Sequence, residues 1–170
     1  MSFLDQVAAL NNYQPGGFMP FEVEGRRVGR VRPAFAEALT THSDVFSAAG
    51  PGVTLHPDLV GFDERTDAVA GVLAALVDRG VIRYLQGESY PVTLDRRDQA
   101  LFAIDRGTAG YFGVRTFGQH LNGYVRREEE IHLWIARRAR DRRIFPGRLD
   151  NLVAGGLPHG LSLRDNLLKE

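Results

Sequence analysis

The C-terminal end of the sequence reads Gly155-Gly156-Leu157-Pro158-His159-Gly160-Leu161-Ser162-Leu163-Arg164-Asp165-Asn166-Leu167-Leu168-Lys169-Glu170. Adjacent glycines let the backbone turn tightly and come close to a ligand. Ser162 is a favoured N-cap residue, and the residues after it favour a helix. The stretch therefore predicts a short strand that ends in glycines, then a loop, then a helix.

This stretch resembles the opening of the Nudix box, G-x5-E-x7-R-E-U-x-E-E-x-G-U, in which U is a bulky aliphatic residue. Gly155 stands at the first glycine, Lys169 at the arginine, and Glu170 at the glutamate that follows the arginine. Gly156 and Gly160 belong to the same loop. The resemblance implies that the chain enters the catalytic motif of a Nudix hydrolase and ends inside that motif.

Two residues depart from the motif. Leu161 stands where the box has its first glutamate, and Lys169 replaces the arginine. Lysine keeps the positive charge but lacks the planar fork with which arginine binds a carboxylate. Asp165, four residues earlier on the predicted helix, is a candidate partner for Lys169. These changes affect the contacts that hold the loop in shape more than they affect the metal site.

The resemblance implies a magnesium-dependent diphosphatase in which Glu170 is catalytic and binds the metal. Carboxylates three and four residues apart share one helix face, and Mg²⁺ takes oxygen ligands. By the same resemblance, the backbone carbonyl of Ala154 is a second ligand. The two adjacent glutamates of the motif fall beyond Glu170, so we expect the 170-residue chain alone to be inactive.

The flanks of the box extend the resemblance. Residues 120–125, 132–138 and 146–156 look like a Nudix branch that is similar to the Nudix region linked to fungal thiamin pyrophosphokinase. That branch has a poorly characterised N-terminal domain. The resemblance implies a nucleoside diphosphate-like or thiamin diphosphate-like substrate, with damaged forms of thiamin diphosphate among the candidates.

The fold class that the sequence predicts is α+β. We expect an N-terminal α+β domain of unknown function over residues 1–115 and the N-terminal part of a Nudix α/β/α sandwich over residues 116–170. The expected elements are a hairpin at 21–31, a helix from Pro33, a loop at 40–52, a strand at 53–55, a helix capped by Thr66 whose face at 69–77 is core, strands at 81–85 and 92–94, and an antiparallel pair at 120–126 and 131–137.

A group of arginines lies between the predicted pair and the box. Arg138 and Arg148 are the candidate substrate-binding residues, because guanidinium groups bind phosphate well. The competing interpretation is a solvated loop, partly balanced by Asp141 and Asp150. His120 and His132 lie in strand-like runs and read as packing or surface residues, and Trp134 reads as core.

Composition excludes several function classes. Lys plus Arg is 21 and Asp plus Glu is 21, so no overall charge attracts nucleic acid or an anionic membrane. The chain has no cysteine, which excludes disulfides and thiolate metal sites. No signal peptide or membrane-length apolar run is visible, and we expect a cytoplasmic protein. The expected partner is a small-molecule diphosphate, with a homodimer left open.

Two alternatives to the enzyme remain at this stage. The chain could be a fragment or degenerate Nudix module that binds a phosphorylated ligand without cleaving it. Glu170 would then be an ordinary exposed glutamate at a frayed helix end. Nucleic-acid binding has the arginine group in its favour and the neutral net charge against it.

Overall fold

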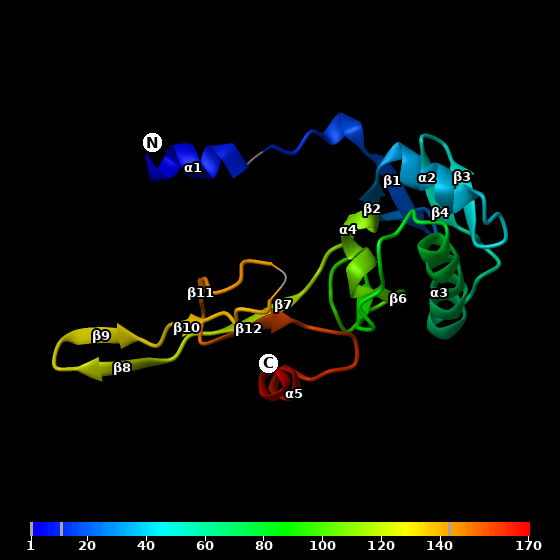
Figure 1. Ribbon diagram of the computed structural model, residues 1–170. Helices are drawn as coiled ribbons and strands as arrows, with labels where there is room; N and C mark the ends of the chain where they lie inside the picture. Colours follow the sequence, from blue (N-terminus) through cyan, green and yellow to red (C-terminus); the bar gives the residue numbers. More distant parts are fainter. Residues whose placement is uncertain (1, 11, 143) are drawn as a thin grey trace.

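The computed structural model describes residues 2–10, 12–142 and 144–170. A four-stranded sheet in the order β2-β1-β4-β3 forms the centre of the N-terminal half (Figure 1). β1 pairs antiparallel with β2 and parallel with β4, while β3 pairs antiparallel with β4. The strands are β1 at Met19–Val23, β2 at Arg26–Val31, β3 at Phe46–Ala49 and β4 at Gly52–Leu55.

The predicted hairpin and the strand at 53–55 are confirmed. At the turn between β1 and β2, Glu24 and Gly25 have φ angles of 52° and 70°. The predicted loop at 40–52 was wrong in part, because β3 lies within it. Phe46 is fully buried there, but the small residues after it give no apolar alternation from which a strand could be recognised.

One helix packs against β3 and β4 of this sheet, and a second packs mainly against the strand at Phe102–Asp105. α2 covers Pro33–Thr40 and buries Phe35, Ala36 and Leu39. α3 covers Phe62–Asp78, so the predicted start at Thr66 was four residues late. The Thr66 hydroxyl does not cap the helix but donates to the Phe62 carbonyl at 2.7 Å and accepts from the Ala103 N–H at 3.0 Å.

The core of the N-terminal half combines the α3 face with a group of aromatic rings. Val69, Val72, Leu73 and Leu76 are buried, which confirms the predicted core face. Phe21 lies 5.1 Å, centroid to centroid, from Phe112 in α4, which covers Ala109–Phe112. The buried core residues span 21–114, and we call residues 19–114 the N-terminal unit.

Two further strands form a separate antiparallel pair in this unit, β5 at Ser89–Val92 and β6 at Phe102–Asp105. The 3-10 helix η2 at Arg106–Thr108 follows β6 directly. The predicted strand at 81–85 was wrong. The N–H groups of Val81 and Ile82 both donate to the Leu76 carbonyl, so this stretch winds around the end of α3 instead of pairing with a strand.

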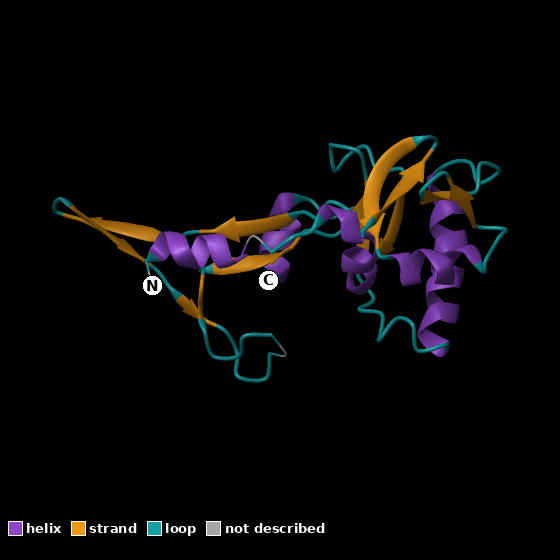
Figure 2. Cartoon of the chain, turned by 90° about the horizontal axis from the view of Figure 1, so that it is seen from above, coloured by secondary structure: helices purple, strands orange, loops and turns teal. Residues whose placement is uncertain are grey.

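Residues 118–170 form an extended C-terminal segment, as Figure 2 shows. The predicted antiparallel pair is confirmed in its middle, where β8 pairs with β9 and Arg127 faces Glu130. The outer ends of the two predicted strands pair elsewhere: β7 pairs with β12, and β10 pairs with β11. The elements are β7 at Gly118–Leu121, β8 at Tyr124–Arg127, β9 at Glu130–Leu133, β10 at Ala136–Arg137, β11 at Leu149–Asp150, β12 at Val153–Gly156 and α5 at Leu163–Lys169.

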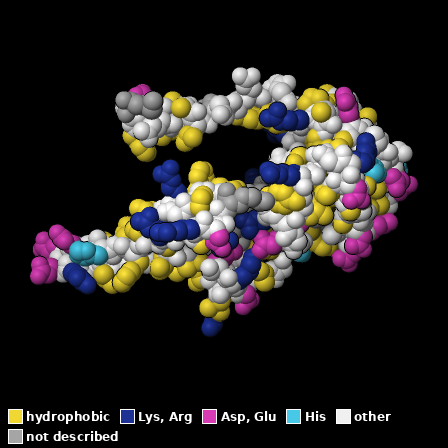
Figure 3. All heavy atoms as spheres, viewed as in Figure 1, with side chains coloured by type: hydrophobic (Ala, Val, Ile, Leu, Met, Phe, Trp, Pro, Cys, Tyr) yellow, Lys and Arg dark blue, Asp and Glu magenta, His cyan; other side chains and the backbone are white. Residues whose placement is uncertain are grey.

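The C-terminal segment buries little apolar surface. Leu157 is the single strongly apolar core residue that the described part of the chain has after Val114. Trp134 is 61% exposed, so its assignment to the core was wrong. Hydrophobic side chains lie along the surface of the β8–β9 arm (Figure 3).

Two short helices precede β1. α1 covers Phe3–Leu10 and is capped by the Ser2 hydroxyl, and η1 covers Pro15–Gly17. None of the helices in the described residues has the length and apolar character to cross a membrane. The division into domains at residues 115 and 116 stays a prediction.

Candidate active site

α5 begins where the sequence predicts. The Ser162 hydroxyl accepts from the Asp165 N–H at 3.1 Å and donates to the Asp165 carboxylate at 2.6 Å. Asp165 therefore closes the N-terminal turn of the helix. Asn166 is fully buried and donates to the Gln119 side chain at 3.3 Å, which holds α5 against β7.

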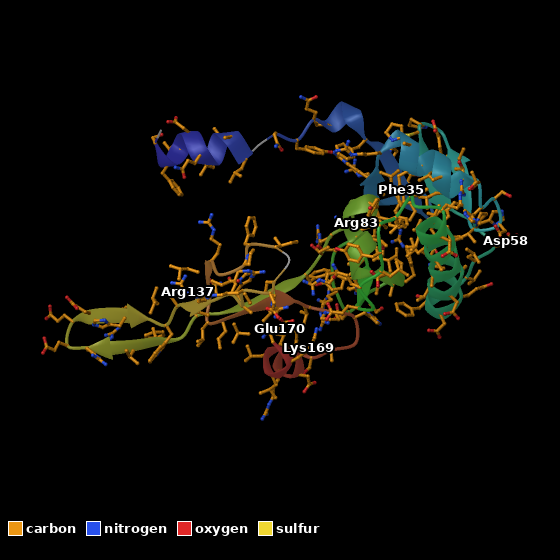
Figure 4. The ribbon with its side chains drawn as sticks, in the orientation of Figure 1. Phe35, Asp58, Arg83, Arg137, Lys169 and Glu170 are labelled. Carbon is orange, nitrogen blue, oxygen red and sulfur yellow. The ribbon has the colours of Figure 1, made fainter. Side chains whose placement is uncertain are left out.

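Glu170 lies at the end of α5 with its carboxylate against the backbone of Gly155. A Cβ atom on Gly155 would overlap this carboxylate, so the close approach requires a glycine. The Glu170 side chain is 17% exposed although it stands at the end of the helix. Figure 4 shows Glu170 beside Lys169 at the end of α5.

Lys169 pairs with a residue far away in the sequence. Its ammonium group contacts a carboxylate oxygen of Glu88, just before β5, and lies 3.6 Å from Glu170. Asp165 was the partner suggested by helix spacing, and the structure replaces it with Glu88. Glu88 also accepts from Arg106 Nη1 at 2.6 Å.

The Glu88 carboxylate is held in its ionised form. The hydrogen bond from Lys169 is the main cause that lowers the pKa of Glu88 below its usual value. Partial burial works against this effect, and the hydrogen bond from Arg106 adds to it. Glu88 therefore binds two cations at once, and these come from the two halves of the chain.

Gly156 is packed as closely as its neighbour. A Cβ atom there would overlap the Tyr90 hydroxyl and would lie 3.2 Å from Arg106 Cζ. The Arg106 guanidinium also lies over the Tyr90 ring, 5.6 Å from its centroid, which is a cation–π contact. Tyr90 is buried, and burial raises the pKa of its phenol, so the hydroxyl keeps its proton near neutral pH.

The N-terminal unit holds residues 155–160, which we call the glycine loop. The His159 N–H donates to the Ser89 carbonyl at 2.7 Å, and the His159 ring stacks on Phe62 with centroids 4.7 Å apart. Arg97 donates to the Pro158 carbonyl at 2.9 Å. Gly160 has a φ of 80°, a conformation that favours glycine, and it turns the chain toward the cap of α5.

A cavity of about 590 Å³ lies between β12, α5 and the start of the N-terminal unit's β5–β6 pair. Five basic and three acidic side chains line it, which leaves a surplus of positive charge suited to an anion. Ala154 and Gly155 also line it. The charged residues are Arg106, Arg137, Arg138, Arg142, Lys169, Glu88, Asp150 and Glu170.

The two candidate arginines are placed differently. Arg138 lines the cavity and donates to Asp150 at 2.6 Å, which lowers the pKa of that carboxyl. Arg138 Nε donates to the carbonyls of Ile144 and Phe145, and Nη2 donates to the Ile144 carbonyl. Arg148 is exposed and stands outside the cavity wall. Arg138 thus holds the segment between β10 and β11, which we call the irregular loop, while facing the space that a ligand would fill.

The donor set fits a magnesium site in part. Glu170 and Ala154 line one cavity, and Mg²⁺ in phosphate-processing sites is held by one or two carboxylates together with phosphate oxygens and waters. Within residues 2–10, 12–142 and 144–170, no three His, Asp or Glu side chains gather into a metal-binding group. Glu170 would therefore provide one ligand of a magnesium ion and not a complete site.

Of the two histidines in the predicted strands, His132 lies away from the cavity, whereas His120 faces Ala154 in the β7–β12 pair and lines an adjoining hollow with Arg106 and Arg138. His120 Nδ1 is 2.7 Å from the Asn151 side-chain amide, and His132 faces Glu130 at 3.4 Å on the exposed arm. Glu88, Tyr90 and Arg106 were missed from the sequence. They precede the glycine loop by 49 to 67 residues and carry no motif, so folding alone reveals their place beside it.

Comparison with known proteins adds a family and three relatives. The family described as a domain of unknown function (DUF4743) matches residues 2–116. Nudix hydrolase 24, chloroplastic, of Arabidopsis thaliana is 41% identical over 172 residues, which cover 99% of this chain and 47% of the plant protein.

Two further relatives match along most of the chain. Nudix hydrolase 20, chloroplastic, of the same plant is 40% identical over 91% of this chain and 44% of its own length. The uncharacterized protein YJR142W of Saccharomyces cerevisiae is 26% identical over 94% of this chain and 49% of its own length. The chain spans about half the length of the curated relatives it matches.

Proposed function

We propose that this chain, which belongs to the DUF4743 family and is similar along most of its length to two plant proteins named Nudix hydrolases, contributes to the magnesium-dependent hydrolysis of a diphosphate bond. The observation that carries the proposal is the position of the Glu170 carboxylate. It lies against Gly155 inside a cavity whose other charged residues are mostly basic. The proposed substrates are nucleoside diphosphate-like or thiamin diphosphate-like.

Each part of the cavity has a role in this proposal. Arg138 and Lys169 attract and orient the diphosphate, because charge-assisted hydrogen bonds to phosphate oxygens are strong. Glu170 and the Ala154 carbonyl are the residues that would hold Mg²⁺, whose chemistry is to neutralise the diphosphate and activate water. The glycine loop brings the backbone close to the substrate. Holding the reactants in one orientation supplies much of the rate.

The alternative is a module that binds a phosphorylated ligand without cleaving it. The observation in its favour is that the described residues supply one carboxylate ligand at the end of α5 and no group of three. Both functions use the same basic cavity. They differ in whether bound diphosphate is turned over, so an assay of hydrolysis beside an assay of binding separates them.

We expect the 170-residue chain to show no diphosphatase activity, while a version extended through the two adjacent glutamates of the motif is active with Mg²⁺. One carboxylate at a helix end does not fix a cation that prefers octahedral coordination. The assay is phosphate release from thiamin diphosphate analogues and nucleoside diphosphate sugars, with Mg²⁺ and with EDTA. Turnover by the 170-residue chain would show that the catalytic centre lies elsewhere.

Replacing Arg138 and Arg148 together with alanine should weaken diphosphate binding by about tenfold or more, since hydrogen bonds to charged groups contribute about 1.5–3 kcal/mol each. Because Arg138 lines the cavity and Arg148 does not, the single Arg138→Ala variant should account for most of the loss. Calorimetric titration with inorganic pyrophosphate measures both. Equal affinity in the double variant and the unaltered chain would favour the solvated-loop interpretation.

A further inference from the structure

Arg106 enters the cavity from the N-terminal unit. It is the first residue of η2, directly after β6, and its side chain is 38% exposed. The cavity that it lines is otherwise built mainly from β10, the irregular loop, β12 and α5. A cationic side chain from the DUF4743 part of the chain therefore faces the same space as Glu170 and Lys169.

The neighbours of Arg106 fix its guanidinium from three sides. Nη1 donates to Glu88 at 2.6 Å, and the centroid of the Tyr90 ring lies 5.6 Å from Cζ. The Gly156 backbone packs so closely against Arg106 and Tyr90 that no side chain would fit there. The Arg106 N–H also donates to the Glu88 carbonyl at 2.7 Å. An arginine ordered in this way before a ligand arrives loses little conformational entropy when it binds.

Part of the guanidinium is free to bind. Nε and Nη2 of Arg106 have no hydrogen-bond partner among the residues that the structure describes. Two parallel N–H donors match the spacing of phosphate oxygens, and such paired contacts are stronger and more specific than one ammonium contact. Glu88 is shared between Arg106 and Lys169, and Lys169 also lies 3.6 Å from Glu170, so the net positive charge of the cavity comes from its three other arginines.

We propose that Arg106 is a diphosphate-binding residue and that the N-terminal unit thereby forms one wall of the substrate site. Glu88 is the positioning residue that aims Arg106 and Lys169 into the cavity. This inference rests on the proposed function, because it takes the same diphosphate as ligand. It assigns a role to the DUF4743 part, which would hold the glycine loop and contact the substrate directly.

The test is calorimetric titration of the 170-residue chain with inorganic pyrophosphate at low salt. Arg106→Ala should weaken binding by about tenfold or more. The matched control is Arg79→Ala, which removes the same charge from the same unit at a site where arginine contacts Thr41. The control should bind pyrophosphate with nearly unchanged affinity. Comparable affinities for the two variants, with binding by the unaltered chain intact, would overturn this inference alone.

A second variant distinguishes a loss of binding from a loss of the fold. Arg106→Lys keeps the charge and loses the fork, so its affinity should fall several-fold while its thermal unfolding stays close to that of the unaltered chain. An affinity equal to that of the unaltered chain would contradict paired hydrogen bonding by Arg106. Absence of pyrophosphate binding by the unaltered chain would overturn the proposed function together with this inference.

Discussion

Replacing Glu170 with glutamine is expected to lower diphosphate hydrolysis by the extended protein about 100-fold or more, which corresponds to about 2.7 kcal/mol in the activation barrier. Glutamine has nearly the same shape as glutamate, so the packing against Gly155 is retained. The neutral amide is a poor replacement for a carboxylate in binding a hard cation. The loss should appear in kcat at saturating Mg²⁺.

The matched control for this change is Glu37→Gln. Glu37 is an exposed helical glutamate in α2, away from the cavity, and its replacement should leave kcat unchanged. Thermal unfolding of the two variants should agree with that of the unaltered protein. Full activity in Glu170→Gln would show that another group performs the chemistry and would remove the main support for the proposed site.

Replacing Gly156 with alanine is expected to destabilise the fold by about 2 kcal/mol, because inserting a methyl group into a packed site commonly costs 1–3 kcal/mol. The new Cβ atom would meet the Tyr90 hydroxyl, which belongs to a buried ring and cannot swing away. For a chain of this size, the midpoint of thermal unfolding should fall by about 6 °C. Calorimetry measures the shift.

Two comparisons identify the cause of that loss. Adding Tyr90→Phe removes the atom that the new methyl group meets, so the double variant should recover part of the stability, as contacting residues do in double-mutant cycles. Gly71→Ala makes the same chemical change inside α3, where a Cβ atom meets nothing. It should raise stability slightly. A fall of equal size at Gly71 would contradict the steric explanation.

Local signals made much of the fold readable from the sequence. The turn at Glu24-Gly25, the apolar face of α3 and the Ser162 cap each act within a few residues, and each prediction was confirmed. β3 could not be predicted because Phe46 is followed by small residues, and its partner β4 supplies the pairing. The outer strands β7 and β10 pair with β12 and β11, which no local pattern reveals.

In the candidate site, too, contacts between residues that are distant in the sequence could not be predicted. The resemblance to the Nudix box led us to expect Glu170 and Ala154 near one another, and both line the same cavity. The partner of Lys169 does not follow from any helix spacing, because Asp165 is used by the cap and Glu88 arrives from another part of the chain. Long-range contacts of this kind depend on tertiary packing and leave no periodic signal.

The exposed β8–β9 arm implies two levels of backbone stability in one molecule. Every residue of both strands is exposed, and an isolated two-stranded hairpin is marginally stable in water. Its amide protons should exchange with solvent through local opening, whereas those of β1 and β4 need the aromatic core to open. The glycine loop is tied to the N-terminal unit by Ser89 and Phe62, so its amide protons should exchange more slowly than those of the arm.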